Sequence, residues 1–428
     1  MSTRTDLAAE AFIYGFPLVF DLEEVDRFTK NGMGSVPPTP FNVFGHAGAL
    51  AGPDDTFVSI NNDTIYSIAQ VDVSGGPVRL EVPDADGRYY VLQFVDAWTN
   101  NFAYVGHRAT GTKAGSYLLV APDWAGEAEE TVIHCPTTVA SIVGRWAVAG
   151  EDDLPAVRAL QSGLTLTPTA PGRGLPQAED VPHELRFLER LRVWMRAFPP
   201  APRDIEYQQR FAAIGLLDET SPYTAPDAEL AAGLAAGREQ METALEHAGD
   251  ADTGWHVNNH MFDYNLDFFE VGAIDAPEWK IAGPARYLVR TLAARGGLWG
   301  NHAYEAAYSM TYKDAAGELL EGDRRYELRF DTQPPVDAFW SVTMYSLPDF
   351  YLVENPLGRY SIGDRTPGLR YGADGSLTLT IQHDEPEDPA NWLPAPSGRF
   401  RPILRMYQPQ ASVFDGSYAL PPITRVSA

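Results

Sequence analysis

The sequence predicts a mainly β protein in which two sandwich domains flank a helical segment. Residues alternate between apolar and polar over short stretches of 56–143 and again after Ala306, as expected of strands with one buried face. Between these regions, 184–198 and 226–247 are rich in Ala, Leu and Glu at the spacing of amphipathic helices. A chain of 428 residues can hold two or three cores. The expected domains are an N-terminal helix with the first sandwich at 1–175, a helical segment at 176–295 and the second sandwich at 296–428.

The first domain is expected to begin with a helix and to continue as antiparallel sheet. Apolar residues near helical spacing predict a helix over 5–28, with a kink at Pro17. Gly, Pro and Asp then separate a series of short β-type stretches. The predicted strands are 57–60, 64–73, 78–82, 89–95, 117–120, 131–134 and 139–143.

The middle of the chain is expected to be helical, and its end is expected to return to strands. The stretch 165–182 is rich in Pro, Gly and Thr and is predicted to be a linker. Helices are predicted at 154–164, 184–198, 207–214, 226–247 and 281–295. Strands of the second sandwich are predicted at 326–330, 339–345, 377–382 and 403–407.

The charge of the chain argues against two classes of partner. With 58 Asp and Glu against 32 Lys and Arg, the formal net charge is −26, which repels phosphate backbones and anionic lipids. We therefore expect neither nucleic acid nor membrane as a partner. No apolar run approaches the roughly 20 residues of a membrane helix, and no signal-peptide pattern opens the sequence. With a single cysteine as well, the chain is expected to be cytoplasmic.

A polar cluster, Asn61-Asn62-Asp63, precedes the strand predicted at 64–73. Asn62 can supply a donor and an acceptor to a ligand, and Asp63 can act as a general base. The alternative is an Asx-turn, in which these side chains bond to their own backbone.

Alternation along 89–95 places Arg88, Tyr90 and the other even-numbered residues on one face of the predicted strand and the odd-numbered residues on the other. A buried guanidinium at Arg88 needs a carboxylate partner or holds an anionic group of a substrate. The structural alternative is an ion pair with Asp96 or Asp72.

The stretch 339–345 alternates in the same way. Ser341, Thr343 and Tyr345 share one face, where their hydroxyls can line a cavity, while Trp340 lies on the opposite, apolar face that is expected to form core. Jelly rolls and related sandwiches can hold ligands, and ligand pockets combine apolar walls with a few polar groups.

Two further arginines, Arg359 and Arg405, are candidate clamps for an anion, because a guanidinium matches the geometry of a carboxylate or phosphate. The alternative is that they pin a loop to the sheet.

The sequence gives little support for a metal or a nucleotide cofactor. His256 and His260 would share one face of a helix, a spacing that suits a metal, but Asn258-Asn259 disfavours helix and the Glu of the zinc-protease helix is absent. There is also no Gly-rich phosphate loop after a first strand, no P-loop lysine and no Gly-x-Ser-x-Gly elbow. We therefore expect no metal and no cofactor.

Several short phrases occur in order along both halves of the chain. In the first half they include Tyr14-Gly15-Phe16-Pro17-Leu18-Val19, Asn62-Asp63-Thr64-Ile65-Tyr66-Ser67, Gly87-Arg88-Tyr89-Tyr90, Asp96-Ala97-Trp98 and Gly144-Arg145. In the second half they include Phe339-Trp340-Ser341-Val342-Thr343-Met344-Tyr345, Val353-Glu354-Asn355-Pro356, Arg359-Tyr360-Ser361-Ile362-Gly363, Asn391-Trp392-Leu393-Pro394 and Leu404-Arg405-Met406-Tyr407. With these phrases the chain resembles the bacterial proteins that pair the domains of unknown function 1254, first, and 1214, second.

This resemblance covers most of the chain, from Tyr14 to Tyr407. It implies an Ig-like β-sandwich first, then a small helical domain, and a jelly-roll-like sandwich last, but it implies little about a reaction. The segment 254–280 departs from the family phrasing. It is either where the specificity of this protein lies or a loop that has drifted in sequence.

From these residues we expect a cofactor-independent enzyme, a hydrolase, lyase or isomerase, that acts on a small, partly apolar organic molecule in a pocket between the two sandwiches. The expected catalytic residues are Asp63, Arg88 and Tyr345, and the expected substrate-binding residues are Asn62, Tyr66, Tyr90, Trp98, Trp340 and Arg359. The alternative is a non-catalytic protein that binds a small molecule or a carbohydrate. A homodimer is the expected assembly.

Overall fold

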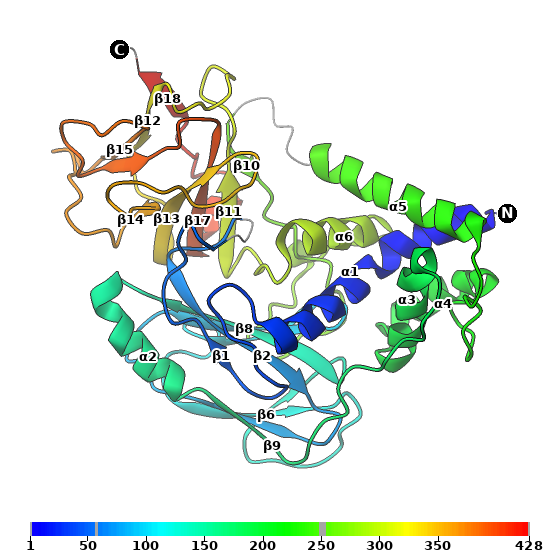
Figure 1. Ribbon diagram of the computed structural model, residues 1–428. Coiled ribbons are helices and arrows are strands. Elements are labelled where there is room, and N and C mark those ends of the chain that lie inside the picture. The colour runs from blue at the N-terminus through cyan, green and yellow to red at the C-terminus, as the bar shows by residue number, and fades with distance from the viewer. Residues whose placement is uncertain (1, 56–58, 248–253, 427–428) are drawn as a thin grey trace.

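The computed structural model describes residues 2–55, 59–247 and 254–426, and it confirms the predicted fold class. The strands in these ranges form four sheets, which pair into two sandwiches with a helical segment between the two domains (Figure 1). No helix in this part of the chain is long and apolar enough to cross a membrane.

The first sandwich packs a five-stranded sheet, of order β1-β2-β8-β4-β5, against a four-stranded sheet, of order β7-β6-β3-β9. Tyr90, Leu92 and Phe94 of β4 lie in the core between the sheets, whereas Val91 lies in a separate buried cluster, because successive side chains of a strand point to opposite faces. The strands are β1 Gly45–His46, β2 Thr64–Asp72, β3 Val78–Val82, β4 Tyr90–Asp96, β5 Asn101–Gly106, β6 Gly115–Val120, β7 Thr131–His134, β8 Val139–Ala147 and β9 Thr165–Pro168.

The second sandwich has the same plan, with one sheet of order β10-β11-β17-β13-β14 and another of order β16-β15-β12-β18. Trp340, Val342 and Met344 of β13 face its core, as the alternation predicts. The strands are β10 His256–Val257, β11 Ala306–Met310, β12 Arg325–Phe330, β13 Val336–Ser346, β14 Ser361–Gly363, β15 Leu377–Gln382, β16 Trp392–Pro394, β17 Phe400–Pro409 and β18 Ile423–Val426.

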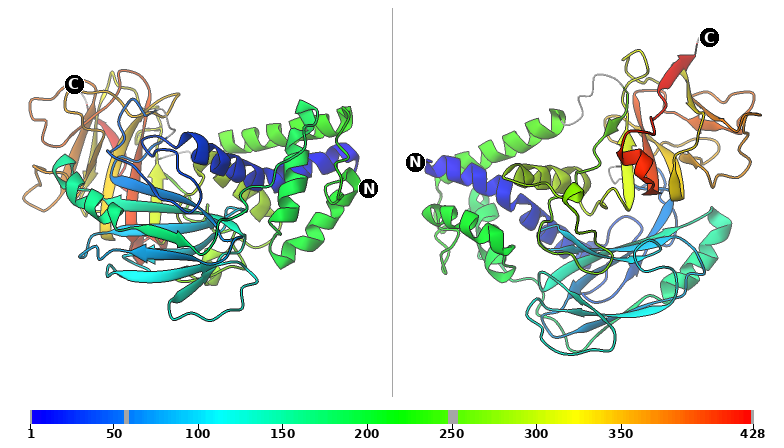
Figure 2. Two further views of the ribbon diagram at one scale, coloured as in Figure 1. Left: turned by 60° about the horizontal axis from the view of Figure 1, so that its bottom comes forward. Right: turned by 180° about the vertical axis from the view of Figure 1, so that it is seen from behind.

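The helices between the two sandwiches gather around α1, which runs from the N-terminus to the first sandwich (Figures 1 and 2). Thr3 and Asp6 cap α1 reciprocally, each side chain accepting a hydrogen bond from the backbone of the other. The α-helices are α1 Arg4–Asn31, α2 Leu154–Ser162, α3 Arg186–Ala197, α4 Ile205–Gln209, α5 Ala228–His247, α6 Ala285–Gly297 and α7 Ala411–Phe414. Short 3₁₀ helices are Glu151–Asp153, His183–Leu185, Pro202–Asp204, Arg210–Ile214 and Pro277–Trp279. The domain boundaries at 175 and 295 stay a prediction. Helix α1, which was expected to belong to the first domain, packs with the helices α3, α5 and α6 from the middle of the chain.

Several sequence-based expectations are corrected. The stretch 165–182 is not wholly a linker, because β9 pairs with β3 and completes the edge of the first sandwich. Ser59 and Ile60 are not strand, and the rest of the strand predicted at 57–60 lies outside the described residues. The helix expected at 207–214 divides into the end of α4 and a 3₁₀ turn. Pro17 lies inside α1 without ending it.

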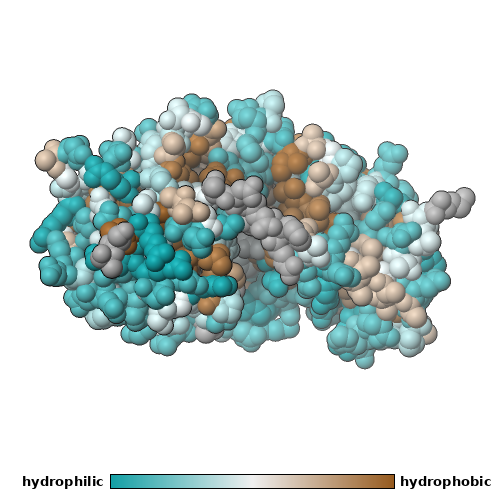
Figure 3. Space-filling view, turned by 90° about the horizontal axis from the view of Figure 1, so that it is seen from above, coloured by the Kyte–Doolittle hydropathy of each residue, from teal (hydrophilic) through white to brown (hydrophobic). Residues whose placement is uncertain are grey.

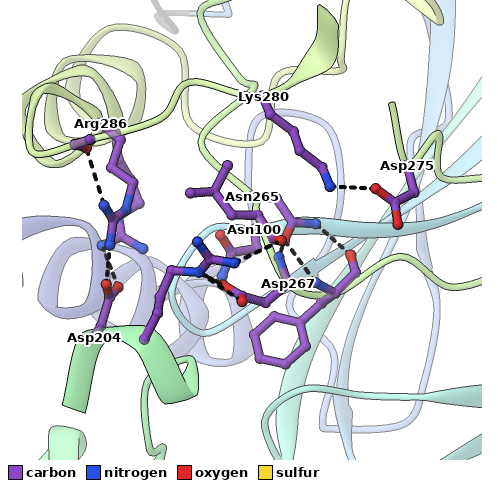
Figure 4. A network of polar contacts seen from close by, with 12 residues as sticks. Asn100, Asp204, Asn265, Asp267, Asp275, Lys280 and Arg286 are labelled. Carbon is purple, nitrogen blue, oxygen red and sulfur yellow. Dashed lines mark hydrogen bonds and ion pairs between the residues drawn. The ribbon is translucent and has the colours of Figure 1, made fainter. Parts of the chain in front are cut away.

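The segment that precedes α6 closes the free edge of β5. The backbone N–H of Tyr104 donates to the carbonyl of Val271 at 2.8 Å, and the N–H of Glu270 donates to the carbonyl of Phe102 at 2.8 Å. Asn265 donates to the carbonyl of Asn101 at 2.9 Å, in the polar network of Figure 4. The segment that departs from the family phrasing therefore serves the fold as an edge cover, since an unpaired strand edge invites unwanted pairing.

Polar contacts also tie this segment to the helices. Arg203 of the 3₁₀ helix Pro202–Asp204 forms an ion pair with Asp267 of the segment at 2.8 Å, and Asp204 of the same 3₁₀ helix pairs with Arg286 of α6 (Figure 4). The segment is thereby held between the helices and the first sandwich.

Two glycines of α5 allow the close packing of α5 on α1. A Cβ atom at Gly233 would lie 2.3 Å from the carbonyl oxygen of Thr5 and 2.6 Å from the Cβ of Ala8. A Cβ atom at Gly237 would lie 2.8 Å from the carbonyl oxygen of Ala9. These contacts are with backbone and with short side chains, which cannot move aside cheaply.

We predict that Gly233→Ala lowers the free energy of unfolding by about 1–3 kcal/mol, because the new methyl group overpacks this contact. In a solvent-exposed helix the same change normally stabilises by about 1 kcal/mol, so the expected sign is reversed. Urea unfolding followed by circular dichroism measures the change. Ala236→Gly, at an exposed position of α5, is the control, because it measures the difference in helix propensity between Ala and Gly without a change in packing. A Gly233→Ala variant more stable than the parent chain would contradict the proposed packing.

Candidate functional site

The outer faces of the two five-stranded sheets meet and form a buried cluster that both sandwiches share. Tyr89, next to β4, packs edge-on against Phe339 of β13 at 5.4 Å and against Tyr407 of β17 at 5.6 Å, measured between ring centroids. Phe339 and Tyr407 stack on each other at 4.1 Å. Such pairs stabilise beyond the area they bury, so this cluster positions the two sandwiches.

Asp63 lies at this junction and is buried, with 5% of the residue exposed. One oxygen accepts a hydrogen bond from the hydroxyl of Tyr407 at 2.7 Å, and the other accepts one from the hydroxyl of Ser341. Both donors belong to the second sandwich. Burial, together with the Asp63 carboxylate, raises the pKa of Tyr407 well above its ordinary value, so this hydroxyl keeps its proton and donates.

The predicted Asx-turn is present beside this carboxylate. The side-chain oxygen of Asn61 accepts a hydrogen bond from the backbone N–H of Asp63 at 2.7 Å, and its amide donates to the hydroxyl of Tyr407 at 2.5 Å. The turn therefore aims Asp63 at the second sandwich.

Residues of the second sandwich also hold the loop that precedes Asp63. The hydroxyl of Tyr345 donates to the carbonyl of Ile60 at 2.6 Å. Arg405 donates to the carbonyl of Ser59 at 2.9 Å and to the hydroxyl of Thr343 at 3.1 Å. The hydroxyl face of β13 thus meets the first sandwich, and its polar groups form hydrogen bonds at the contact between the two domains.

A second buried carboxylate, Glu305, lies near the other side of the aromatic cluster. Its oxygens accept hydrogen bonds from the hydroxyl of Tyr89 at 2.9 Å and from Nε of Arg108 at 2.7 Å. Because Glu305 is 1% exposed and directly precedes β11, it joins the first sandwich to the second as Asp63 does.

A cavity of about 960 Å³ opens beside these contacts, with walls from both sandwiches. The first sandwich supplies 84–89, His107, Ala147, Asp152 and Asp153, and the second supplies 337–339 and Arg365. Its size lies within the usual range of small-molecule pockets. We call it the junction pocket.

The two arginines of the junction pocket differ in their partners. Arg88 forms a two-pronged ion pair with Asp153, with both contacts at 2.6 Å, so the expected partners Asp96 and Asp72 were wrong. Arg365 donates to the backbone carbonyl of Asp63 at 3.0 Å and lies 3.5 Å over the ring of Phe339. No ion pair joins Arg365 to a carboxylate within the described ranges, and burial lowers the pKa of its guanidinium from the ordinary value.

None of the expected binding residues is in the lining of this pocket, and three of them lie in the cores of the sandwiches. Tyr90 stacks on Trp146 at 4.8 Å inside the first sandwich. Trp98 lies in the same core and donates to the carbonyl of Phe198 at 2.9 Å. Trp340 lies in the core of the second sandwich. The structure does not bring these rings together with Asp63, because each of them points to the interior face of its sheet or domain.

The other expected residues form structural contacts. Asn62 donates to the carbonyl of Ala51 at 2.5 Å. The ring of Tyr66 lies 5.5 Å from the guanidinium of Arg145. Arg359 donates to the backbone carbonyls of Pro389, Ala390 and Trp392, which agrees with the alternative of a pinned loop.

His256 and His260 do not share a helix face, because His256 lies in β10 and His260 lies in a turn. Nδ1 of His260 lies 2.7 Å from a carboxylate oxygen of Asp263, whose other oxygen lies 4.0 Å from Nε2 of the buried His302. Across the part of the chain that is described, no group of three or more His, Cys, Asp or Glu side chains is arranged to hold a metal ion.

Sequence reasoning missed Arg365, Glu305 and His302. Arg365 and Glu305 lie outside the predicted strands, and each meets partners that are far away in the sequence. The sequence did carry a signal for Ser341, one of the two donors to the Asp63 carboxylate, because the alternation along 339–345 places Ser341 on the polar face.

Comparison with known proteins agrees with this two-domain arrangement. Residues 41–168 match the family described as protein of unknown function DUF1254, and residues 305–411 match the family described as protein of unknown function DUF1214. The chain is similar to the solved structure of the VPA0106 protein from Vibrio parahaemolyticus, with 25% identity and a TM-score of 0.76 over 99% of this chain and 100% of that one. A putative uncharacterized protein from Burkholderia cenocepacia aligns over 98% of this chain and 89% of its own, with 13% identity and a TM-score of 0.48. No curated protein matches.

We predict that Asp63→Asn destabilises the chain, because an amide has one acceptor oxygen for two hydroxyl donors. The loss of a hydrogen bond to a charged group costs about 1.5–3 kcal/mol, which the midpoint of urea unfolding measures. Tyr407→Phe should show coupling with Asp63→Asn in a double-mutant cycle. Asp54→Asn makes the same chemical change at an exposed position and should have little effect. Independent, additive effects of the two substitutions would contradict a direct contact.

A second prediction concerns the pH dependence of stability. His302 is 2% exposed, and burial lowers its pKa to about 3. Below its ordinary pKa of 6.5, the unfolded chain therefore binds a proton that the folded chain does not, and stability falls as the pH is lowered. Burial raises the pKa of Asp263 to about 6, so the titration of Asp263 opposes this trend. Asp263 is present both in the parent chain and in a His302→Gln variant.

We expect His302→Gln to reduce the loss of stability between pH 6.5 and pH 4.5 by up to about 1.4 kcal/mol per pH unit. Urea unfolding at a series of pH values gives the two slopes. His383→Gln, at an exposed position, is the control. Equal slopes for His302→Gln and the parent chain would show that His302 is not kept neutral by the fold.

Proposed function

This chain belongs to the proteins that pair a DUF1254 domain with a DUF1214 domain, and we propose that its junction pocket binds a small zwitterionic organic molecule. The observation that carries the proposal is the guanidinium of Arg365, which lines a pocket rich in carboxylates yet forms no ion pair within the described ranges. The negatively charged group of the ligand pairs with Arg365, and its positively charged group lies among the aspartates.

The anionic group of the ligand is assigned from the partners of the two arginines. Arg88 is already occupied by Asp153 through two contacts of 2.6 Å. Arg365 uses one nitrogen for the carbonyl of Asp63, and a guanidinium has five N–H donors. Its remaining donors suit a carboxylate, the acceptor whose geometry a guanidinium matches best.

The cationic group is assigned from the charge of the pocket wall. The lining contains five aspartates, of which Asp153 pairs with Arg88 and Asp84 pairs with Lys113. Asp86, Asp152 and Asp337 remain as the negative charges of the wall, against the guanidinium of Arg365. A concave surface of one sign attracts the opposite sign. A simple anion is therefore a poor ligand, whereas an amine that also carries a carboxylate meets both parts of the wall.

Binding is favoured over catalysis by the state of the expected catalytic groups. Both oxygens of Asp63 accept hydrogen bonds from the protein, and the hydroxyl of Tyr345 donates to a backbone carbonyl. A general base must reach the proton that it removes. Catalysis by a hydrolase, lyase or isomerase mechanism with Asp63 as acid or base stays a prediction, as do binding of a carbohydrate, the homodimer and the cytoplasmic location. An Asp63→Asn variant with unchanged folding and unchanged turnover would exclude that role for Asp63.

The proposal predicts that ω-amino acids bind more tightly than compounds with one of their two charges. Isothermal titration calorimetry with glycine, 4-aminobutanoate and 6-aminohexanoate, compared with butanoate and butylammonium, measures this directly. Arg365→Gln should weaken the best zwitterion by about 10- to 100-fold, the equivalent of one hydrogen bond to a charged group, and Arg365→Lys should restore part of the loss.

Arg370→Gln removes a matched guanidinium that is exposed and paired with Asp388, and it should leave binding unchanged. Circular dichroism of each variant verifies that it is folded. The proposal fails if no zwitterion gives saturable heat, or if butanoate binds as well as 4-aminobutanoate.

A further inference from the structure

A second cavity, of about 460 Å³, lies in the second sandwich and shares no lining residue with the junction pocket. One wall is the β10–β11–β17 part of the sheet, where Val257 pairs with Ser309. The segment after β17 forms another wall through Val413, Tyr418 and Leu420. We call it the sandwich cavity.

The lining of the sandwich cavity is mostly apolar, and among the residues described it carries no charged side chain. Its apolar groups include Trp255, Val257, Met406, Val413 and Leu420. The indole N–H of Trp255 donates to the carbonyl of Pro421 at 2.7 Å, which leaves its ring as wall and its polar atom satisfied. A charged ligand would lose its hydration here without gaining a partner, so the cavity suits a neutral molecule.

One polar atom in this wall is unsatisfied. Ser309 is fully buried at 0% exposure, it lines the cavity, and its hydroxyl has no hydrogen-bond partner among the residues described. Buried polar groups are normally paired, so the Ser309 hydroxyl is a fixed point at which a ligand can be recognised. The other hydroxyl in the lining, that of Tyr418, donates to the carbonyl of Thr332 at 3.5 Å, so Ser309 is the group by which the cavity can orient a molecule.

Figure 3 shows the face of the molecule that carries the second sandwich at one end and α5 at the other, with hydrophobic side chains in patches on a mostly hydrophilic surface. Most apolar side chains of the chain are in its cores, so the apolar lining of an open cavity requires an explanation. A structural void would be expected to collapse or to be filled by side chains.

We infer that the sandwich cavity is a second binding site, for a neutral apolar molecule with one hydroxyl or carbonyl group that bonds to Ser309. An aliphatic or aromatic alcohol, aldehyde or ester has this chemistry. The site is independent of the junction pocket, which has charged walls and takes a ligand of opposite character.

Octan-1-ol and 1-chlorooctane are suitable probes, because they are similar in size and differ in the hydrogen-bonding end. Their binding can be measured by calorimetry, with octanoate as the charged comparison. We expect octan-1-ol to bind about two- to tenfold more tightly than 1-chlorooctane, as one neutral hydrogen bond allows, and octanoate to bind more weakly than either.

Two variants in the cavity and two control variants outside it test the site. Ser309→Ala should abolish the preference for octan-1-ol and keep the binding of 1-chlorooctane, and Leu420→Trp, which narrows the cavity from the side of the C-terminal segment, should weaken both probes. Ser417→Ala, on an exposed serine of the same segment, and Arg365→Gln, in the junction pocket, should change neither. Unsaturable binding of both probes, a preference that survives Ser309→Ala, or affinities unaffected by Leu420→Trp would overturn the inference.

Discussion

The hydrogen bonds to the buried carboxylate of Asp63 are the contacts on which the arrangement of the two sandwiches depends. Its donors, Ser341 and Tyr407, lie 278 and 344 positions away in the sequence and on neighbouring strands of one sheet. A buried anion is costly unless it is fully hydrogen-bonded, so only the arrangement in which both hydroxyls reach Asp63 avoids that cost. The shared aromatic cluster contributes buried apolar area, and the hydrogen bonds to the Asp63 carboxylate fix the orientation of one sandwich relative to the other.

This division of roles explains why the two cavities differ. The junction pocket lies where the surfaces of the two sandwiches meet, and such surfaces keep charged residues because each is partly exposed to water. The sandwich cavity lies among strands and the segment that packs on them, where the same rules favour apolar residues. In the part of the chain that is described, the wall of the sandwich cavity without charged side chains and the carboxylate-rich wall of the junction pocket therefore follow from position in the fold. This difference is the basis for proposing ligands of different chemistry.

Local patterns predicted β2, β3, β4, β6, β7, β8, β12, β13, β15 and β17 but missed other strands, among them the fully buried β5 and also β11. The alternation along 339–345 separated the core face from the polar face of β13 correctly. The same alternation already placed Tyr90 and Trp340 on faces that became core, so assigning them to a pocket gave more weight to residue type than to periodicity. The partner of Arg88 was missed because Asp153 lies in a 3₁₀ turn that no strand pattern marks. Short edge strands such as β1 and β14 have two or three residues, too few for any period to be read.

Arg365 links the junction pocket to the contacts that hold the sandwiches together. Its guanidinium covers one face of Phe339 and donates to the backbone carbonyl of Asp63, while Phe339 stacks on Tyr407, the donor to the Asp63 carboxylate. A ligand that pairs with Arg365 therefore acts on the same groups that fix the two domains. Because a molecule that binds only the folded form stabilises it by mass action, the ligand proposed for this pocket would strengthen the junction itself, and separation of the two sandwiches would release it.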